Sequence, residues 1–376
     1  MRVALFSDTF EPQVNGVVNT VKHLLDTFAA QGVEHCLFAP AGGGWRVPFY
    51  PELELSWPDY RQVERKLDAW RPDLIHVVTE FGVGWTGRRY ALRRGVPLVS
   101  SFHTDFPLYL EKYGFPALVS AGWEYLRAFH AASRKTYCPS RDTQAKLRAH
   151  GFRNLALWSR GVTPLPADLT PDEIAGVRRR YALDGRLALL YVGRLSREKD
   201  LPVLLAAYGL LRREFGETVR LLVVGDGPLR SVLEGCAPSG TVFTGYLRGR
   251  ELAAAYAAAD VFAFPSASET FGNAVLEAMS AGLPVVAPAA GGVTENLVPE
   301  HNGLACRPGD IAEFAAALRR LVLDPEERAR LGKNARAWAA ERSWAAVNGA
   351  LLASYRQVIA AASKESQRGK TAEDAA

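Results

Sequence analysis

Two glutamates lie on either side of a segment that is typical of a helix start. In SETFGNAVLEAM, Glu269 precedes Phe271, Gly272 and Asn273, which begin the predicted helix, and Glu277 lies about a turn and a half inside it. Free N–H groups at a helix N-terminus bind anions, and carboxylates accept hydrogen bonds from hydroxyl groups. The segment therefore predicts an anion site between two hydroxyl-binding carboxylates. The alternative interpretation is a favourable charge at the helix start and a solvated Glu277.

Two cations follow another apolar run. In LLYVGRLSREK the run ends at Gly193, and Arg194 and Lys199 come next. A guanidinium and an ammonium beside a glycine suit a diphosphate, although two surface charges in a loop would give the same pattern. In VVGDGPL, Asp226 and Gly227 form a second turn of this kind, but such glycine turns often serve only to connect a strand to a helix.

The N-terminal half offers two further candidates. Gly16, in NGVVN, lies at the start of the first predicted helix, where the backbone can approach a phosphate. His103, in SFHTDF, comes directly after a predicted strand. A lone histidine is more often structural than catalytic, and its position at a strand end leaves both interpretations open.

No metal site is predicted. The four cysteines are scattered without a CxxC pair, so neither a zinc site nor a disulfide framework is indicated, and no Asp-x-Asp motif occurs in the sequence.

The elements that must position these residues alternate between strands and helices. Nearly continuous apolar runs predict buried parallel strands, and the segments between them have helical spacing. In the first half the expected strands include 33–39, 73–78 and 97–102, with helices at 63–70 and 84–94. The same alternation restarts near residue 186, which predicts an α/β protein with two Rossmann-like domains.

A chain of 376 residues is too long for one ordinary core, which agrees with two domains. The expected parts are a first domain at 1–163, a proline-containing linker at 164–185, a second domain at 186–345, a helix at 346–363 that returns to the first domain, and a disordered tail at 364–376. Ligands of parallel sheets bind at the carboxyl ends of the strands, so a cleft between the two domains is the expected site.

Composition and charge narrow the class of protein. Charged residues make up 23% and no apolar run is long enough to cross a membrane, so a soluble, cytoplasmic globular protein is expected. Up to Thr163 there are 20 Lys and Arg against 15 Asp and Glu, and the remainder is balanced at 25 against 25. This surplus suits anionic lipid or a phosphorylated substrate, but it is also compatible with an ordinary solvated surface. No nucleic-acid-binding module is recognisable, so nucleic acid is not an expected partner.

Taken together and in order, NGVVN, SFHTDFPLYLEKYG, YVGRLSREK, VVGDGP and SETFGNAVLEAMSAGLPVVAPAAGGV resemble retaining nucleotide-sugar glycosyltransferases. The resemblance runs from residue 2 to about residue 360 and implies two Rossmann-like domains facing each other across a cleft, the GT-B fold. The TFGNxVLEAM and HTDF variants are most similar to GDP-mannose-dependent α-mannosyltransferases and to sulfoquinovosyl- and glucosyl-diacylglycerol synthases. Thr163 stands where relatives commonly have an acidic residue, so the connection between the domains is expected to differ.

The resemblance implies a role for each candidate. Glu269 would hold the transferred sugar, Glu277 the nucleotide ribose, and the diphosphate would lie between them. The implied donor-binding residues are Gly16, Arg194, Lys199, Asp226, Gly227, Glu269, Phe271, Gly272, Asn273 and Glu277. The implied catalytic residues are Glu269, His103, Arg194 and Lys199.

The expected reaction moves a hexose, first of all mannose from GDP-mannose, to a glycolipid or other glycan hydroxyl. It is expected to need no cofactor and no metal, because cations and a helix N-terminus would neutralise the leaving diphosphate. The alternatives are a UDP-sugar-dependent glucosyl- or sulfoquinovosyl-diacylglycerol synthase, a sugar phosphorylase, and a non-catalytic sugar-nucleotide-binding protein.

A peripheral contact with an anionic membrane, at the inner face of the cell membrane, is also an expectation. The apolar residues Trp123, Leu126 and Phe129 could serve either as a membrane-facing stripe or as core. The cations considered for this contact are Arg88, Arg89, Arg93, Arg94, Arg127, Arg134 and Lys135.

Overall fold

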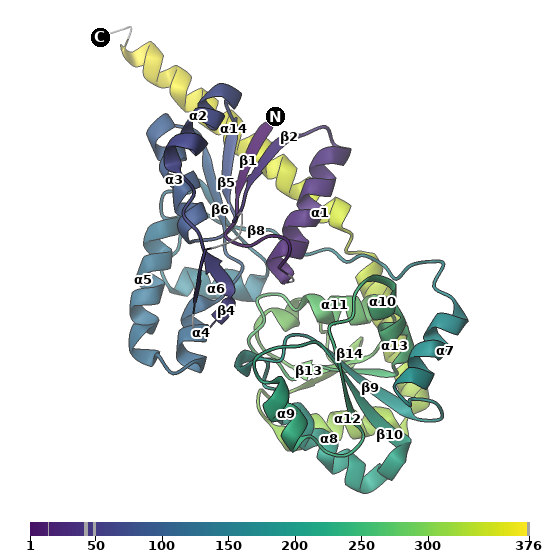
Figure 1. Ribbon diagram of the computed structural model, residues 1–376. Helices are drawn as coiled ribbons and strands as arrows, with labels where there is room; N and C mark the ends of the chain where they lie inside the picture. The colour runs from purple at the N-terminus through teal and green to yellow at the C-terminus, as the bar shows by residue number, and fades with distance from the viewer. Residues whose placement is uncertain (14, 41–43, 48–49, 374–376) are drawn as a thin grey trace. The chain divides into compact units, whose positions relative to one another are not determined.

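The computed structural model describes residues 1–13, 15–40, 44–47 and 50–373. The chain divides into two compact units, drawn in Figure 1. The first unit comprises Met1–Gly161 and Trp344–Ala376, and the second comprises Val162–Ser343.

The first unit is built on a six-stranded parallel sheet in the order β2-β1-β5-β6-β7-β8. Its strands are β1 (Arg2–Phe6), β2 (Glu34–Phe38), β5 (Leu74–Val77), β6 (Leu98–Ser101), β7 (Lys135–Cys138) and β8 (Leu155–Leu157). Its helices before the crossing to the second unit are α1 (Gly16–Ala30), α2 (Tyr60–Trp70), α3 (Gly82–Arg94), α4 (Phe106–Lys112), the 3-10 turn η1 (Pro116–Leu118), α5 (Val119–His130) and α6 (Arg141–Ala149). A short antiparallel pair, β3 (Trp45–Val47) and β4 (Tyr50–Leu55), lies outside this sheet.

The second unit has a six-stranded parallel sheet in the order β11-β10-β9-β12-β13-β14. Its strands are β9 (Leu187–Val192), β10 (Val219–Val224), β11 (Thr241–Gly245), β12 (Val261–Ala263), β13 (Val285–Pro288) and β14 (Gly303–Cys306). Its helices are α7 (Pro171–Arg180), α8 (Leu201–Phe215), α9 (Arg230–Cys236), α10 (Gly249–Ala258), α11 (Asn273–Ser280), α12 (Ile311–Leu323) and α13 (Pro325–Ala340). Short 3-10 turns are η2 (Arg197–Lys199), η3 (Gly216–Thr218) and η4 (Gly291–Glu295).

The strand order of the second sheet defines a ligand edge. The chain runs outward from β9 through β10 to β11 and then returns to the other side of β9 with β12. Loops that follow β9 and β12 therefore leave the sheet in different directions, and a crevice at the carboxyl ends of such strands is the usual ligand site of a doubly wound sheet. The segments with Arg194, Lys199 and Glu269 are the segments that follow β9 and β12.

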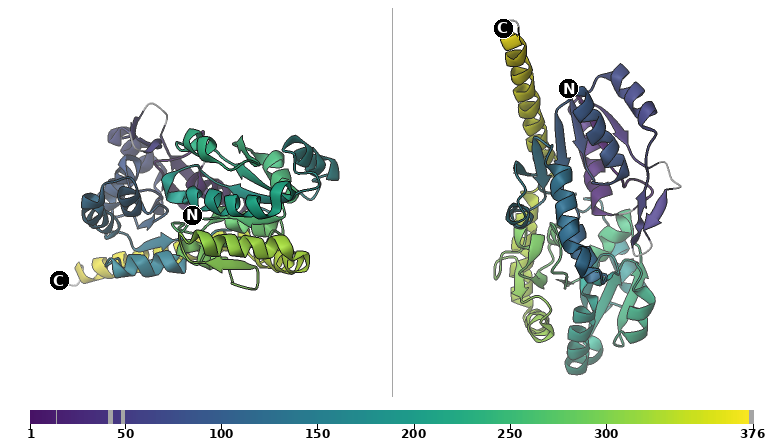
Figure 2. Two further views of the ribbon diagram at one scale, coloured as in Figure 1. Left: turned by 90° about the horizontal axis from the view of Figure 1, so that it is seen from below. Right: turned by 90° about the vertical axis from the view of Figure 1, so that its left-hand side faces the viewer.

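The predicted disordered tail at 364–376 is wrong for the residues that the structure describes, because α14 runs from Trp344 to Glu373. The helix packs into the first unit through buried Leu351, Leu352 and Tyr355. Figures 1 and 2 show its last turns extending beyond the rest of that unit. The segment lacks large apolar residues but is rich in Ala, Lys, Glu and Gln, which favour a helix that has already been nucleated.

The predicted linker at 164–185 is also wrong in its bounds, because this segment belongs to the second unit. Helix α7 begins with a capping box between Thr170 and Glu173 and packs against α10. Val177, Tyr181 and Leu183 are buried in the core of the second unit. The three prolines suggested a linker, but the apolar residues between the charges give this segment a face to bury.

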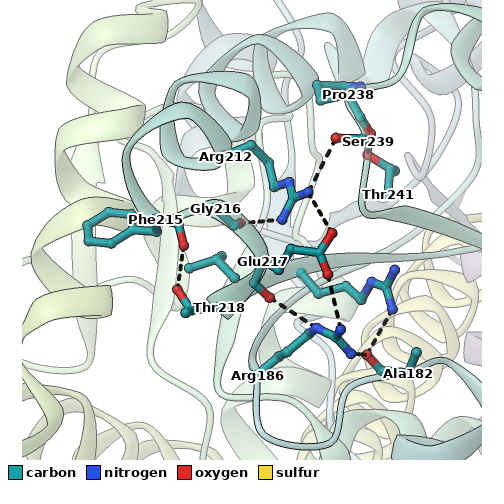
Figure 3. Close-up of polar contacts among 12 residues, drawn as sticks. Ala182, Arg186, Arg212, Phe215, Gly216, Glu217, Thr218, Pro238, Ser239 and Thr241 are labelled. Carbon is teal, nitrogen blue, oxygen red and sulfur yellow. Dashed lines mark hydrogen bonds and ion pairs between the residues drawn. The ribbon is translucent and has the colours of Figure 1, made fainter.

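Polar contacts secure the amino-terminal edge of the second sheet, opposite the ligand edge (Figure 3). Glu217 accepts from the guanidinium of Arg186 at 3.3 Å and forms an ion pair with Arg212 at 3.6 Å. Arg212 also donates to the carbonyl of Gly216 and to the hydroxyl of Ser239. These contacts join the turn before β10 to the segments that lead into β9 and β11, so their role is to hold strand ends.

Candidate functional site

The loop after β9 carries the two predicted cations of the second unit. Tyr191 is fully buried, and its hydroxyl donates to the carbonyl of Arg194 at 3.0 Å. A Cβ at Gly193 would lie 2.7 Å from that hydroxyl, so only glycine fits there without displacement. Nε and Nη1 of Arg194 are shielded from solvent. The turn thus places a largely enclosed guanidinium at the ligand edge.

Lys199 and Glu269 meet across the two loops. Nζ of Lys199 lies 2.5 Å from Oε1 of Glu269, and their side chains are 18% and 14% exposed. The hydroxyl of Ser268 donates to the carbonyl of Glu198 at 2.6 Å, which ties the loop after β12 to η2. The family resemblance implies that Lys199 and Glu269 bind neighbouring parts of one ligand. The structure brings their charged atoms into direct contact.

The start of α11 is shaped by glycines that precede and oppose it. Gly272 occupies the N-cap in the left-handed region at φ 84°, which strongly favours glycine. The N–H of Gly292 donates to the carbonyl of Glu269 at 2.6 Å, and a Cβ at Gly292 would collide with the backbone of Thr270. This GG pair belongs to the motif that carries the family resemblance, but its function was not predicted from the sequence. Its role here is to let η4 pack directly against the Glu269 segment.

Asn273 and Phe271 have different environments. Oδ1 of Asn273 is buried and accepts no hydrogen bond within the described part of the chain. The Phe271 side chain, by contrast, is 3% exposed and packs in the core of the second unit. Phe271, predicted among the donor-binding residues, can therefore contribute only through its backbone.

Glu277 is not the solvated helix residue of the alternative interpretation. The hydroxyl of Tyr256, on α10, donates to Oε2 of Glu277 at 2.9 Å. Burial raises the pKa of Glu277, and the hydrogen bond from Tyr256 opposes that rise. Tyr256 was not singled out from the sequence, because an aromatic residue within ELAAAYAAAD has the pattern of an ordinary core position.

The second glycine turn supports the cation loop. Gly225 and Gly227 have φ of 137° and 158°, and a Cβ at either would collide with the backbone of the 193–195 loop. Oδ1 of Asp226 accepts from the Gly227 N–H at 2.7 Å, and Oδ2 pairs with Arg230 at 2.7 Å. Both carboxylate oxygens of Asp226 thus have partners, one in the turn and one at the start of α9. These contacts fit the alternative considered for this turn, in which it only connects a strand to a helix.

In the first unit, Gly16 begins α1 as predicted. Asn15 is the N-cap, and its side chain accepts from the N–H groups of Val17 and Val18 at 3.0 Å. Asn15 also donates from Nδ2 to Thr9 at 2.9 Å, which connects the helix start to the loop after β1.

His103 lies after β6 and contacts a buried arginine. Nη2 of Arg160 donates to Nδ1 of His103 at 2.6 Å, and both side chains are buried. Burial, with the Arg160 charge, holds the pKa of His103 well below its usual value. Because a guanidinium only donates, Nδ1 is the acceptor and Nε2 carries the proton of the neutral ring.

The residues considered for a membrane contact divide into core and surface. Trp123, Leu126 and Phe129 are at most 9% exposed and belong to the core, so their interpretation as a membrane-facing stripe is wrong. The cations with a carboxylate partner are Arg94 with Asp68, Arg127 with Glu124 and Arg134 with Glu365. Lys135 donates to Ser354.

The remaining cations of that set are Arg88, Arg89 and Arg93 on α3, and no ion pair with a carboxylate joins them within the described ranges. They lie on a helix without acidic residues that also exposes Trp85 and Leu92. In the described segments, no helix is both long and apolar enough to cross a bilayer, and no cluster of three metal-ligating residues occurs.

Comparison with known proteins gives a glycosyltransferase family model for each unit. Residues 14–164 match the family described as "Glycosyltransferase Family 4", and residues 177–338 match "Glycosyl transferases group 1". A GDP-mannose-dependent alpha-mannosyltransferase of Mycobacterium tuberculosis is 36% identical, with 95% of this chain and 97% of the relative covered. A sulfoquinovosyl transferase of Arabidopsis thaliana is 34% identical, with 80% of this chain and 59% of the relative covered.

Among solved structures, a sucrose-phosphate synthase from Thermosynechococcus elongatus superposes with a TM-score of 0.77 at 24% identity, covering 96% of this chain and 99% of the other. This likeness and the two parallel sheets confirm the predicted GT-B class of fold. The chain therefore belongs to the glycosyltransferases, with a family 4 domain in its first unit and a group 1 domain in its second, and it is an enzyme that transfers a sugar.

Proposed function

We propose that this enzyme moves a hexose, in the first instance mannose from GDP-mannose, to a hydroxyl of a glycolipid or other glycan. The observation that carries the proposal is the contact between Lys199 and Glu269 at the ligand edge, next to the start of α11. A phosphate-binding cation and a hydroxyl-binding carboxylate adjoin there, as a sugar diphosphate requires. Glu277 follows within the same helix.

Each group has a chemical role in this proposal. Arg194, Lys199 and the N–H groups at the start of α11 neutralise the charge that develops on the departing diphosphate. Glu269 accepts hydrogen bonds from hydroxyls of the transferred sugar, and Glu277 accepts from the ribose. Glu269 and Lys199 form an ion pair with each other, so donor binding would exchange this pair for contacts of Lys199 with phosphate and of Glu269 with sugar hydroxyls.

The proposed transfer retains the anomeric configuration and needs no metal or cofactor. The bond between the anomeric carbon and the phosphate oxygen breaks, and the acceptor oxygen forms its bond on the same face. The departing phosphate oxygen takes the acceptor's proton, so no carboxylate nucleophile is needed. His103 is proposed to act on the sugar as a neutral donor through Nε2–H.

Relatives support mannose and lipid without deciding between donors. The relative from Mycobacterium tuberculosis is named for GDP-mannose, and it is similar over nearly the whole chain. The sulfoquinovosyl transferase and an alpha-monoglucosyldiacylglycerol synthase of Streptococcus pneumoniae, 28% identical, support a second candidate. In that candidate a UDP-sugar is the donor and a diacylglycerol lipid the acceptor.

We also propose that α3 contacts an anionic membrane at its inner face. Arg88, Arg89 and Arg93 supply charge, and exposed Trp85 and Leu92 supply apolar area. The triple variant R88Q/R89Q/R93Q should lose binding to vesicles that contain phosphatidylserine. Substitution of three partnered cations, in R94Q/R127Q/R134Q, should retain most of it. Equal binding by both variants would contradict a role for α3.

The donor is tested by incubating purified protein with a panel of GDP- and UDP-sugars in EDTA, with and without a glycolipid acceptor, and measuring nucleoside diphosphate release. Lipid-stimulated release from GDP-mannose supports the first candidate, and preference for a UDP-sugar supports the second. Glu269→Ala should abolish release in either case. Release that depends on a divalent cation would contradict the metal-independent mechanism, and release that depends on inorganic phosphate would indicate a phosphorylase.

A further inference from the structure

Glu277 is held by one enclosed tyrosine. Tyr256 is 2% exposed, and its hydroxyl donates to Oε2 of Glu277 at 2.9 Å. Its ring packs against Phe262 of β12, with the ring centroids 6.1 Å apart. Because the core encloses the ring, the hydroxyl approaches the carboxylate from one fixed direction.

The Glu277 carboxylate has few other polar contacts in the described structure. In the described part of the chain no ion pair joins it to a cation, and the Tyr256 hydroxyl is its one hydrogen-bond donor. Glu277 is half-buried, and a carboxylate that is partly withdrawn from water without a cation costs free energy, so such a group is a candidate for a ligand-binding role. A tyrosine hydroxyl has a single proton to donate. It therefore engages Oε2 and leaves Oε1 able to accept from a ligand.

A second buried tyrosine shows that core packing alone does not require this arrangement. Tyr208, on α8, is also fully buried, and its hydroxyl donates to the carbonyl of Val219 at 3.2 Å. A backbone carbonyl thus satisfies a buried tyrosine without bringing a charge into the core. The pairing of Tyr256 with Glu277 instead joins a buried hydroxyl to a half-buried carboxylate, which a purely structural role leaves unexplained.

We propose that Tyr256 is a positioning residue of the donor site, which fixes the Glu277 carboxylate so that Oε1 accepts from the nucleotide ribose. This inference rests on the proposed function, because it assigns the ligand of Glu277 to a nucleoside diphosphate. The hydroxyl of Tyr256 acts through Glu277 and does not itself touch the donor.

The test compares ribose with deoxyribose. Calorimetry measures binding of GDP, UDP and their 2′-deoxy forms to wild type, Tyr256→Phe and the matched control Tyr208→Phe, after thermal unfolding has shown that all three are folded. Wild type should prefer the ribonucleotide by about tenfold, the effect of one hydrogen bond to a charged group. Tyr256→Phe should lose most of this preference, and Tyr208→Phe should keep it. In kinetics with the donor, Tyr256→Phe should raise KM and leave kcat nearly unchanged.

A Glu277→Gln background separates positioning from packing. There, Tyr256→Phe should have no further effect on the ribose preference, because the group that it positions is already changed. A full ribose preference in Tyr256→Phe itself would overturn the inference and leave the proposed function intact. Wild type that binds the nucleotides without preferring ribose would remove the role given to Glu277, and the inference with it. Wild type that binds none of them would overturn the proposed function as well.

Discussion

At the scale of single residues, the site is organised by charges that are only partly exposed. Lys199 and Glu269 neutralise each other, while Glu277 has a hydroxyl partner and no cation in the described structure. The sequence predicted the identities of these residues because their spacing within the motifs is distinctive. It could not predict Tyr256, since a buried tyrosine within a helix has no sequence pattern that distinguishes it from core. It also suggested a donor contact for Phe271, whose side chain the fold uses for packing.

Removal of one partner of the Lys199–Glu269 pair should destabilise the second unit about as much as removal of both. Lys199→Met leaves a poorly exposed carboxylate without its cation, and Glu269→Gln leaves the ammonium unpaired. Each should lower the free energy of unfolding by about 1–3 kcal/mol, and the double variant should recover roughly half of the summed loss. Urea denaturation of the four proteins measures this coupling. Strict additivity would show that the pair contributes nothing.

His103 should remain neutral and keep its proton on Nε2 at every pH at which the enzyme is folded. Donation by Arg160 fixes the tautomer, and burial holds the pKa of His103 well below its usual value. Nitrogen chemical shifts of ¹⁵N-histidine-labelled protein should show an unprotonated Nδ1 from pH 5.5 to 8. His150, on the surface of the first unit, provides a comparison within the same spectrum. Titration of His103 near its ordinary pKa would contradict the proposed donor role.

At the scale of elements, the alternation of strands and helices was predictable, but the use of segments with little apolar content was not. The 164–185 segment contains three prolines, yet Val177 and Leu183 anchor it to the second core. The last residues of α14 have almost no apolar side chains, yet the helix continues through them because Leu352 and Tyr355 hold its first half. In both segments tertiary packing decides the structure, and local composition does not report it.

The first half of α14 should therefore act as core. Leu352 is fully buried in the first unit, so Leu352→Ala should lower that unit's free energy of unfolding by about 2–5 kcal/mol. Arg356→Ala, on the exposed side of the same helix, should change it by less than about 0.5 kcal/mol. Hydrogen exchange of β1 and β5 amides reports the difference. Equal protection in both variants would show that the helix does not contribute to this core.

At the scale of the whole molecule, each unit encloses polar groups that link its stability to pH. His76, in the first unit, is fully buried, with Nε2 2.6 Å from the Ser101 hydroxyl and Nδ1 2.5 Å from that of Tyr355. Burial lowers the pKa of His76 to about 3. Between pH 6.5, the ordinary pKa of histidine, and about pH 3, His76 is protonated only in the unfolded state. The contribution of neutral His76 to the free energy of unfolding is therefore complete above pH 6.5 and is lost as the pH falls.

Protonation of His76 in the unfolded state should lower the free energy of unfolding of the first unit by about 2 kcal/mol at pH 5 relative to pH 7.5. Buried Asp8 and Glu80, whose pKa values are raised by burial, act in the opposite direction. Wild type and His76→Gln both contain Asp8 and Glu80, so the contribution of these two carboxyl groups cancels in the difference between the two free energies of unfolding. That difference should shrink as the pH falls from 7.5 to 5, in urea titrations at matched ionic strength. A difference that does not vary with pH would mean that His76 titrates alike in both states.

The proposed enzyme transfers a sugar from a nucleoside diphosphate sugar at the ligand edge of the second unit. The most direct measurement of this transfer is NMR of the enzyme with donor labelled with ¹³C at the anomeric carbon, in EDTA and with the glycolipid that stimulates nucleotide release. The wild-type enzyme should move the label from its phosphate linkage into an α-glycosidic bond to the lipid, and Glu269→Ala should not make this product. Label that remains in the donor or is recovered only as free sugar would contradict transfer, and a β-linked first product would contradict retention.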